Sequence, residues 1–100
     1  MSTRGNIEFS DKWDTFFIDR SHDAFPDNIL ADIKETVDKC KGRWSGSELG
    51  QLVSYFLGSN FDPQCRIQNY EPISGLAGDE CYEYYVKWDE ENEEYIYGVR

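Results

Sequence analysis

One histidine and three cysteines are the side chains of this 100-residue chain best suited to act as a nucleophile, base or metal ligand. His22 is followed directly by Asp23, and a histidine beside a carboxylate can serve as a base or bind a metal. Adjacent loop residues rarely point at one centre, however, and the chain holds no second histidine. A Cys–His pair would need Cys40, Cys65 or Cys81, none of which is predicted at a helix N-terminus, where a thiolate is stabilised. We therefore predict no catalytic residue, no metal site and no cofactor, and keep a small hydrolase using His22 with a cysteine as the minor alternative.

The cysteines and the hydrophobic pattern bear on the compartment. In a cytosolic protein, three cysteines without C-x-x-C spacing are expected to stay reduced and to pack as small, mostly buried apolar residues. No apolar run approaches the ~20 residues of a membrane-spanning helix, and no hydrophobic stretch of the signal-peptide kind follows Arg4. We expect a cytoplasmic protein without membrane contact. One disulfide with one free thiol is the secreted alternative.

Carboxylates are far more numerous, and they are concentrated near the C-terminus. The chain has 20 Asp and Glu against 10 Lys and Arg, a net charge of −10, and the window from Asp79 to Glu94 supplies −7 of it with eight carboxylates and one lysine. Glutamates in or beside an exposed turn have no apolar pocket to raise a pKa, which argues against a glycosidase-like pair. Direct nucleic-acid binding is disfavoured, because scattered basic residues do not offset ten excess negative charges.

Aromatic residues alternate with these acids, unlike in a disordered acidic tail. We predict an ordered hairpin in which one strand turns Tyr82, Tyr84, Val86 and Trp88 toward the core and a mixed Tyr/Glu face outward. Exposed tyrosines beside carboxylates suit a protein–protein contact, because aromatic side chains anchor it and charges steer it. The predicted partner-binding residues are Glu80, Glu83, Tyr85, Asp89, Glu90, Glu91, Glu93, Glu94 and Tyr97.

The density of charge limits what this hairpin can imitate. Seven net charges along a strand of about 25 Å give about one charge per 3.6 Å, half the line density of duplex DNA. Full mimicry needs help from Asp32, Glu35 and Asp38, which share one stripe of the first predicted helix, or from a second copy in a homodimer. Two other interpretations stay open: a charged solubility surface that discourages edge pairing, and tyrosine pairing for stability alone.

The elements that position these residues begin with two strands and a helix. Strands are predicted at residues 6–10 and 13–20 around a tight turn at 11–12, and the second strand is apolar on both faces, as expected inside a sheet. A helix over 26–41 ends at Gly42. At the start of this helix, Phe25 is predicted as a hydrophobic staple and Asp27 as a capping residue or first-turn acid. Its apolar stripe is Ile29, Leu30, Ile33, Val37 and Cys40.

The second half of the chain completes a seven-element order. The capping pattern Ser45 to Glu48 opens a helix that ends at Gly58. A strand over 65–70, a glycine-containing turn over 72–79 and a hairpin of 80–88 with 93–99 follow. The order β-β-α-α-β-β-β predicts one α+β domain over residues 1–100, with an antiparallel sheet of about five strands and two helices packed on one face.

Two short stretches, Thr3-Arg4-Gly5-Asn6-Ile7 and His22-Asp23-Ala24-Phe25-Pro26, carry a resemblance. They resemble a group of small, poorly characterised phage and bacterial proteins with a T-R-G-x-I-like start and a (Tyr/His)-Asp-Gly-Tyr-Pro-like motif before a helix. The match covers about the first third of the chain, which has Ala-Phe in place of Gly-Tyr. The group brings no established activity. The resemblance implies a viral or mobile-element origin, in which small acidic proteins often disable host nucleic-acid enzymes.

The functional hypothesis is a small, acidic, non-enzymatic binding protein. We expect it to engage a basic, nucleic-acid-binding surface of a host protein in the host cytoplasm, as a partial DNA mimic of the anti-CRISPR or anti-restriction type. The partner would be a nucleic-acid enzyme. A structural or assembly subunit of a phage particle, which would associate with itself, is the main alternative.

Overall fold

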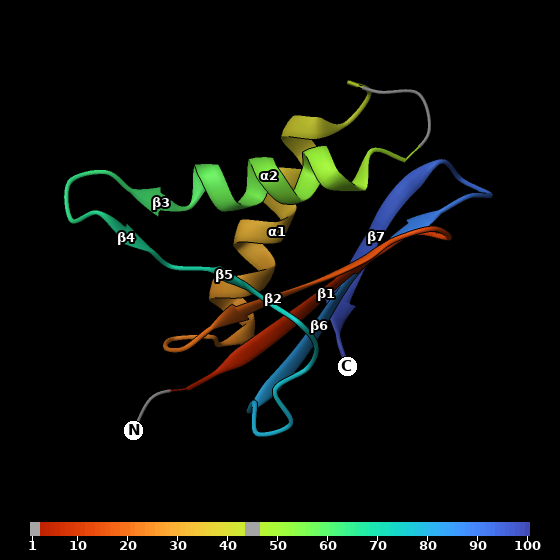
Figure 1. Ribbon diagram of the computed structural model, residues 1–100. Coiled ribbons are helices and arrows are strands. Elements are labelled where there is room, and N and C mark those ends of the chain that lie inside the picture. The colour runs from red at the N-terminus through yellow and green to blue at the C-terminus, as the bar shows by residue number, and fades with distance from the viewer. Residues whose placement is uncertain (1–2, 44–46) are drawn as a thin grey trace.

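The computed structural model describes residues 3–43 and 47–100. Two helices follow the first two strands in chain order, and the remaining strands follow the helices (Figure 1). In chain order the elements are β1 (Gly5–Ser10), β2 (Thr15–Arg20), α1 (Pro26–Cys40), α2 (Leu49–Ser59), β3 (Phe61–Asp62), β4 (Ile67–Gln68), β5 (Glu71–Ile73), β6 (Tyr82–Asp89) and β7 (Glu94–Val99). The predicted strand at 6–10, the first helix and the C-terminal hairpin are confirmed to within about two residues, the usual uncertainty of helix ends.

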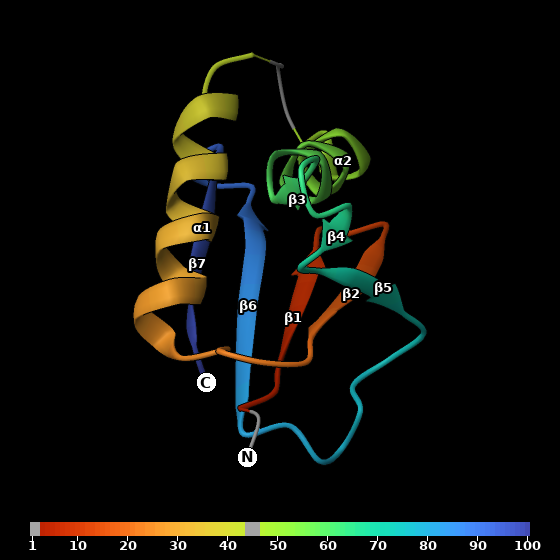
Figure 2. The ribbon, with the colours of Figure 1, turned by 90° about the vertical axis from the view of Figure 1, so that its left-hand side faces the viewer.

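A five-stranded sheet with the order β5-β2-β1-β6-β7 forms one layer. Both helices lie on the same face of it, α1 along β6 and β7 and α2 across the end of β1 (Figures 1 and 2). The α+β class is confirmed, and β2 lies inside the sheet as expected. The sheet is mixed, however: β1 pairs with β6 in parallel, while the other three pairings are antiparallel. The parallel pair is compatible with the chain because both helices lie in the connection between its strands.

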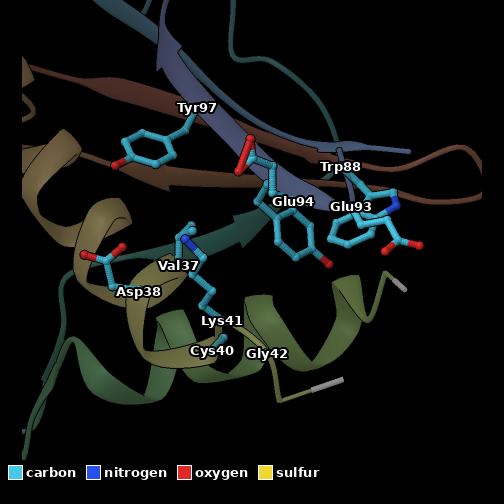
Figure 3. A pocket seen from close by; sticks show the side chains of 10 residues that line it. Val37, Asp38, Cys40, Lys41, Gly42, Trp88, Glu93, Glu94 and Tyr97 are labelled. Atoms are coloured by element: carbon cyan, nitrogen blue, oxygen red, sulfur yellow. The ribbon is translucent and has the colours of Figure 1, made fainter. Parts of the chain in front are cut away.

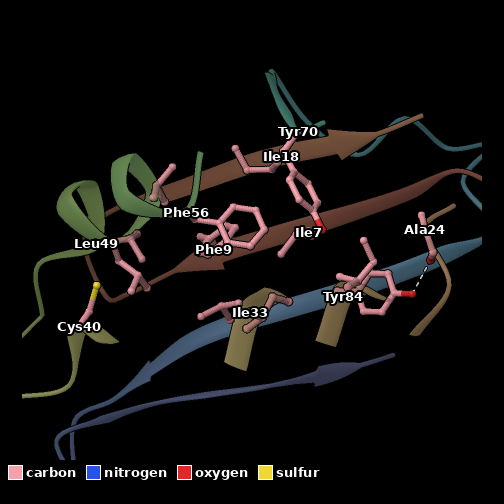
Figure 4. Close-up of a cluster of buried hydrophobic side chains, with 14 residues drawn as sticks. Ile7, Phe9, Ile18, Ala24, Ile33, Cys40, Leu49, Phe56, Tyr70 and Tyr84 are labelled. Atoms are coloured by element: carbon pink, nitrogen blue, oxygen red, sulfur yellow. Dashed lines mark hydrogen bonds between the residues drawn. The ribbon is translucent and has the colours of Figure 1, made fainter. Parts of the chain in front are cut away.

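The core fills the space between the sheet and the helices (Figure 4). Its aromatic centre is Phe56 of α2, whose ring lies 5.3 Å from that of Phe9 and 4.5 Å from that of Tyr70. Alternation along β6 buries Tyr84 and Val86, as predicted. The other buried residues of this cluster are Ile7, Ile18, Ala24, Ile29, Ile33, Cys40, Leu49, Leu52 and Val53.

The ends of the helices agree with the sequence in part. Gly42 follows α1 with a φ of +74°, the left-handed conformation predicted for it. Phe25 is itself the N-cap of α1 and is 46% exposed, so the predicted staple was wrong, while Asp27 is the first-turn acid as expected. The predicted capping residue Ser45 lies outside the described residues. Gly58 lies within α2 rather than after it.

Three other expectations were wrong. Of the strand predicted at 65–70, only β4 forms, and it pairs with β3 in a small hairpin separate from the main sheet. The strand that joins the main sheet is β5, which overlaps the start of the turn predicted at 72–79. Trp13 lies in the β1–β2 turn and not in a strand. All three cysteines are free, but only Cys40 is buried, whereas Cys65 and Cys81 are exposed.

The two stretches that carry the resemblance pack against each other. The N–H of Ala24 donates to the carbonyl of Thr3 (3.0 Å), and the Tyr84 hydroxyl donates to the carbonyl of Ala24 (2.6 Å, Figure 4). A Cβ placed on Gly5 would lie 2.8 Å from the Ala24 Cβ. The loop before α1 is thus fixed to the start of β1, which gives both stretches a structural role.

Candidate functional site

The parallel pairing of β1 with β6 places two acidic turns side by side. Both strands end at the same edge, so the β1–β2 turn lies beside the β6–β7 turn, and Lys12 Nζ is 3.4 Å from Glu90 Oε1 across the gap. The start of α2 joins them through Ser47, whose hydroxyl donates to Asp11 (2.8 Å). We call this region the acidic end and define it as Asp11, Asp14, Glu48, Asp89, Glu90, Glu91, Glu93 and Glu94.

Two carboxylates of the acidic end shape the turns that carry them. Asp11 accepts the backbone N–H groups of Trp13 (2.8 Å) and Asp14 (2.7 Å). Burial alone would raise the pKa of Asp11, but these bonds and the Ser47 hydroxyl outweigh it and hold the pKa below its usual value. Asp89 accepts the Asn92 side-chain amide (2.8 Å), and this bond, with backbone N–H groups in the turn, lowers the pKa of Asp89. Both groups therefore stay charged at neutral pH.

The predicted binding residues are only partly brought together. Asp89, Glu90, Glu91, Glu93 and Glu94 lie in the acidic end. Glu80 precedes β6 at the opposite end of that strand, near the Arg4 guanidinium, and its buried Oε2 has no hydrogen-bond partner among the residues that the structure describes.

The predicted residues within the strands lie on opposite faces of the sheet. Glu83 and Tyr85 are on the face away from the helices, where Arg100 pairs with Glu83 and with Glu8 (3.1 Å) and lies over the Tyr85 ring at 5.6 Å. Tyr97 lies opposite Val86 in the register and points toward α1 (Figure 3). Tyr85 and Tyr97 therefore cannot anchor the same contact.

The three acids of α1 that were expected to extend the charged surface are paired with cations. Asp38 lies 2.6 Å from Lys34, and Glu35 lies 3.9 Å from Lys39. Asp32 accepts the buried Tyr70 hydroxyl (2.6 Å) and lies 3.5 Å from Arg20. The extension of the acidic surface comes from the β1–β2 turn instead.

Trp13, predicted to lie in a strand, is a surface residue of the β1–β2 turn. It is 71% exposed at the tip of the β1–β2 turn, and the Lys12 ammonium lies 4.3 Å from its ring centroid. The sequence feature that could have predicted this turn is the pair of aspartates at positions 11 and 14, since an aspartate that accepts nearby backbone N–H groups is typical of turns. Tryptophan is one of the residue types enriched among the side chains that contribute most to protein–protein binding.

A groove of about 430 Å³ adjoins the acidic end, between α1 and the strands β6 and β7 (Figure 3). Trp88, Tyr95 and Tyr97 give it an aromatic wall. Tyr95 is fixed there, because its hydroxyl accepts the N–H of Glu48 (3.1 Å) and lies 3.1 Å from the Ser47 hydroxyl. The other lining residues are Val37, Asp38, Cys40, Lys41, Gly42, Glu93 and Glu94.

The residues considered for catalysis do not form a reactive pair. His22 is exposed, and its Nδ1 lies 3.3 Å from the neighbouring Ser21 hydroxyl; no hydrogen bond joins it to a cysteine among the described residues. Burial raises the pKa of the Cys40 thiol, which keeps it protonated. In the part of the chain that the structure describes, no cluster of His, Cys, Asp and Glu side chains could hold a metal ion.

Comparison with known proteins gives no match: no protein-family model, curated protein or solved structure is similar to the chain. Over residues 3–43 and 47–100, no helix has both the length and the apolar character needed to cross a membrane. The functional argument therefore rests on the acidic end and on the groove beside it.

Proposed function

We propose that this protein is a small, acidic, non-enzymatic binder whose acidic end engages a basic, nucleic-acid-binding surface of another protein. The parallel β1–β6 pairing carries the proposal, because it adds a second acidic turn to the hairpin. Among the described residues, Glu90 is the one member of the acidic end that forms an ion pair. Unpaired carboxylates on one end create a negative potential that steers a basic partner.

The exposed Trp13 favours a protein-binding role over a charged surface that serves solubility alone. A solubility surface needs only charge, whereas a 71% exposed tryptophan leaves apolar surface in water that a contact would bury. We propose a nucleic-acid enzyme of the host of a phage or mobile element as the partner, with the protein acting as a partial DNA mimic of the anti-CRISPR or anti-restriction type.

A pull-down with a matched charge control tests this function. The test variant carries Glu90→Gln, Glu91→Gln, Glu93→Gln and Glu94→Gln. The control removes four charges elsewhere, with Asp23→Asn, Asp27→Asn, Glu35→Gln and Glu71→Gln. Host lysate is passed over each protein at low and high salt, and bound proteins are challenged with double-stranded DNA.

The expected result is a nucleic-acid-binding protein that the wild type and the control retain. Salt and DNA should release it, because both compete for the same basic surface. The test variant should lose at least tenfold in affinity, about 1.4 kcal/mol. Retention that is equal for all three proteins, or no retained nucleic-acid-binding protein, would reject the proposal.

A further inference from the structure

We propose that the groove between α1 and β7 holds an arginine side chain of the partner. This inference rests on the proposed function, since it names the group by which a basic partner would be recognised. Its support is the coincidence of an aromatic wall, unpaired carboxylates and a helix C-terminus in one groove.

The aromatic wall suits a guanidinium group. Trp88 is 8% exposed and its ring lies 4.9 Å from the ring of Tyr95 at 65°, so the two rings form an edge-to-face pair. The bonds of the Tyr95 hydroxyl to the start of α2 hold this ring in place before a ligand arrives. Guanidinium groups stack on aromatic faces and are weakly hydrated, so they leave water more readily than an ammonium does.

The charge of the groove selects a cation. Glu93 and Glu94 form no ion pair with any described residue, and Asp38 is paired with Lys34. Lys41 is the one basic residue among the ten that line the groove. The groove also lies at the C-terminal end of α1, where the helix dipole favours positive charge by about 0.3–1 kcal/mol.

The size and position of the groove fit an anchoring side chain. Its volume of about 430 Å³ falls in the range of roughly 300–1,000 Å³ typical of ligand sites. Because Glu93 and Glu94 belong both to its lining and to the acidic end, a partner steered by the acidic turns would reach the groove directly. Charge complementarity therefore favours an arginine of the partner over an apolar segment or a second copy of this acidic chain.

Nuclear magnetic resonance with short peptides tests the inference without knowledge of the partner. The probe is a blocked five-residue peptide with one central arginine among glycine and serine. The matched probes replace that arginine by lysine or by citrulline, which keeps the shape of arginine but carries no charge. The readout is the indole N–H signal of Trp88 in the 15N-labelled protein.

The arginine peptide should shift the Trp88 signal in a saturable way. The lysine peptide should bind at least about threefold more weakly, and the citrulline peptide should leave the signal unchanged, because the groove selects both charge and planarity. An equal response to arginine and citrulline, or no response to arginine, would overturn the inference.

Two variants localise the binding to the groove. Val37→Phe should fill the groove without a change in charge and abolish the shift, whereas Ala31→Phe on the exposed side of α1 should not. Glu93→Gln with Glu94→Gln should weaken binding at least threefold more than Glu90→Gln with Glu91→Gln. Equal effects of the two glutamate pairs would show attraction by general charge and reject the groove.

The outcomes separate this inference from the function on which it rests. If the partner from the lysate binds the Val37→Phe variant as well as the wild type, the acidic end acts without the groove and only the inference fails. If the lysate yields no basic partner while the arginine peptide binds in the groove, the proposed function fails and the site remains.

Discussion

At the scale of single residues, Gly5 is the described glycine at which an added Cβ would lie closest to a neighbouring atom. A Cβ on Gly5 would lie 2.8 Å from the Ala24 Cβ and 3.2 Å from Cε2 of Tyr84, which is shorter than ordinary packing allows. Glycine is required at this position because the loop before α1 packs against the start of β1, where the Ala24 N–H donates to the Thr3 carbonyl and the Ala24 carbonyl accepts the 2.6 Å bond from Tyr84 of β6.

Gly5→Ala should therefore destabilise the protein by about 1–3 kcal/mol, the usual cost of overpacking. Adding Ala24→Gly should recover part of this loss, because it removes the atom in conflict. Urea unfolding measures both effects, and Gly50→Ala, where a Cβ meets open space within α2, should instead stabilise by about 0.5–1 kcal/mol. If the double variant loses as much free energy of unfolding as the two single variants together, this account is wrong.

The sequence predicted residue types on the binding surface better than their directions. The five acids from Asp89 to Glu94 share the acidic end as expected, but Tyr85 and Tyr97 face opposite ways. Their directions depend on which residue of β6 lies opposite which residue of β7, and the register pairs Asp89 with Glu94. Turn length sets this register, so a prediction of the turn to within one residue was needed.

At the scale of elements, the local patterns predicted the helices and the hairpin but not the partner of β1. Alternation of apolar residues reports which face of a strand is buried and does not identify the neighbouring strand. The parallel pair is therefore invisible in the sequence, although it assembles the acidic end. The short strand β5 was missed because it is a three-residue edge strand that contains Pro72.

The segment between β5 and β6 is tied to the sheet by a buried polar pair. Asn6 accepts the N–H of Ala77 (2.8 Å) and donates to Asp19 (2.7 Å), which also accepts Arg4 Nε at 2.7 Å. Asn6 is fully buried and Asp19 is 3% exposed, so both depend on these bonds for compensation of their desolvation.

Asn6→Ala should cost about 1–3 kcal/mol, because it removes a donor to the buried Asp19 carboxylate and the side-chain acceptor of the Ala77 N–H. Asn6→Asp should cost more at pH 7 than at pH 4. Its new carboxyl would lie against Asp19, which raises the folded-state pKa above the unfolded value of about 3.9. The folded variant is therefore most stable while this carboxyl is protonated, and that stability is lost as the pH rises through the folded-state pKa. Urea unfolding of both variants and the wild type at the two pH values checks this, and a pH-independent loss in both would refute it.

At the scale of the whole molecule, composition alone predicted a folded acidic protein, and the structure shows where its charge imbalance is concentrated. The net charge of −10 comes from 20 acids and 10 basic residues. Among the described residues, ion pairs neutralise three acids of α1, whereas only one member of the acidic end is paired. Carboxylates gathered at one end repel one another and reduce the stability of the folded state. Such a cost is commonly retained where a surface serves binding.

The variant with Glu90, Glu91, Glu93 and Glu94 all changed to Gln should therefore be more stable than the wild type while it loses the partner. A gain of about 1 kcal/mol would raise Tm by roughly 4–8 °C for a domain of this size. The gain should shrink from 10 mM to 1 M salt, because the Debye length falls from about 30 to 3 Å. Calorimetry at both salt concentrations measures this gain in stability.

The control variant with four charges removed elsewhere should gain less stability, since those acids are spread over the surface and one is already paired. An equal gain in both variants would mean that the repulsion is spread over the whole molecule, and a lower Tm in the first would mean that these glutamates stabilise the hairpin instead.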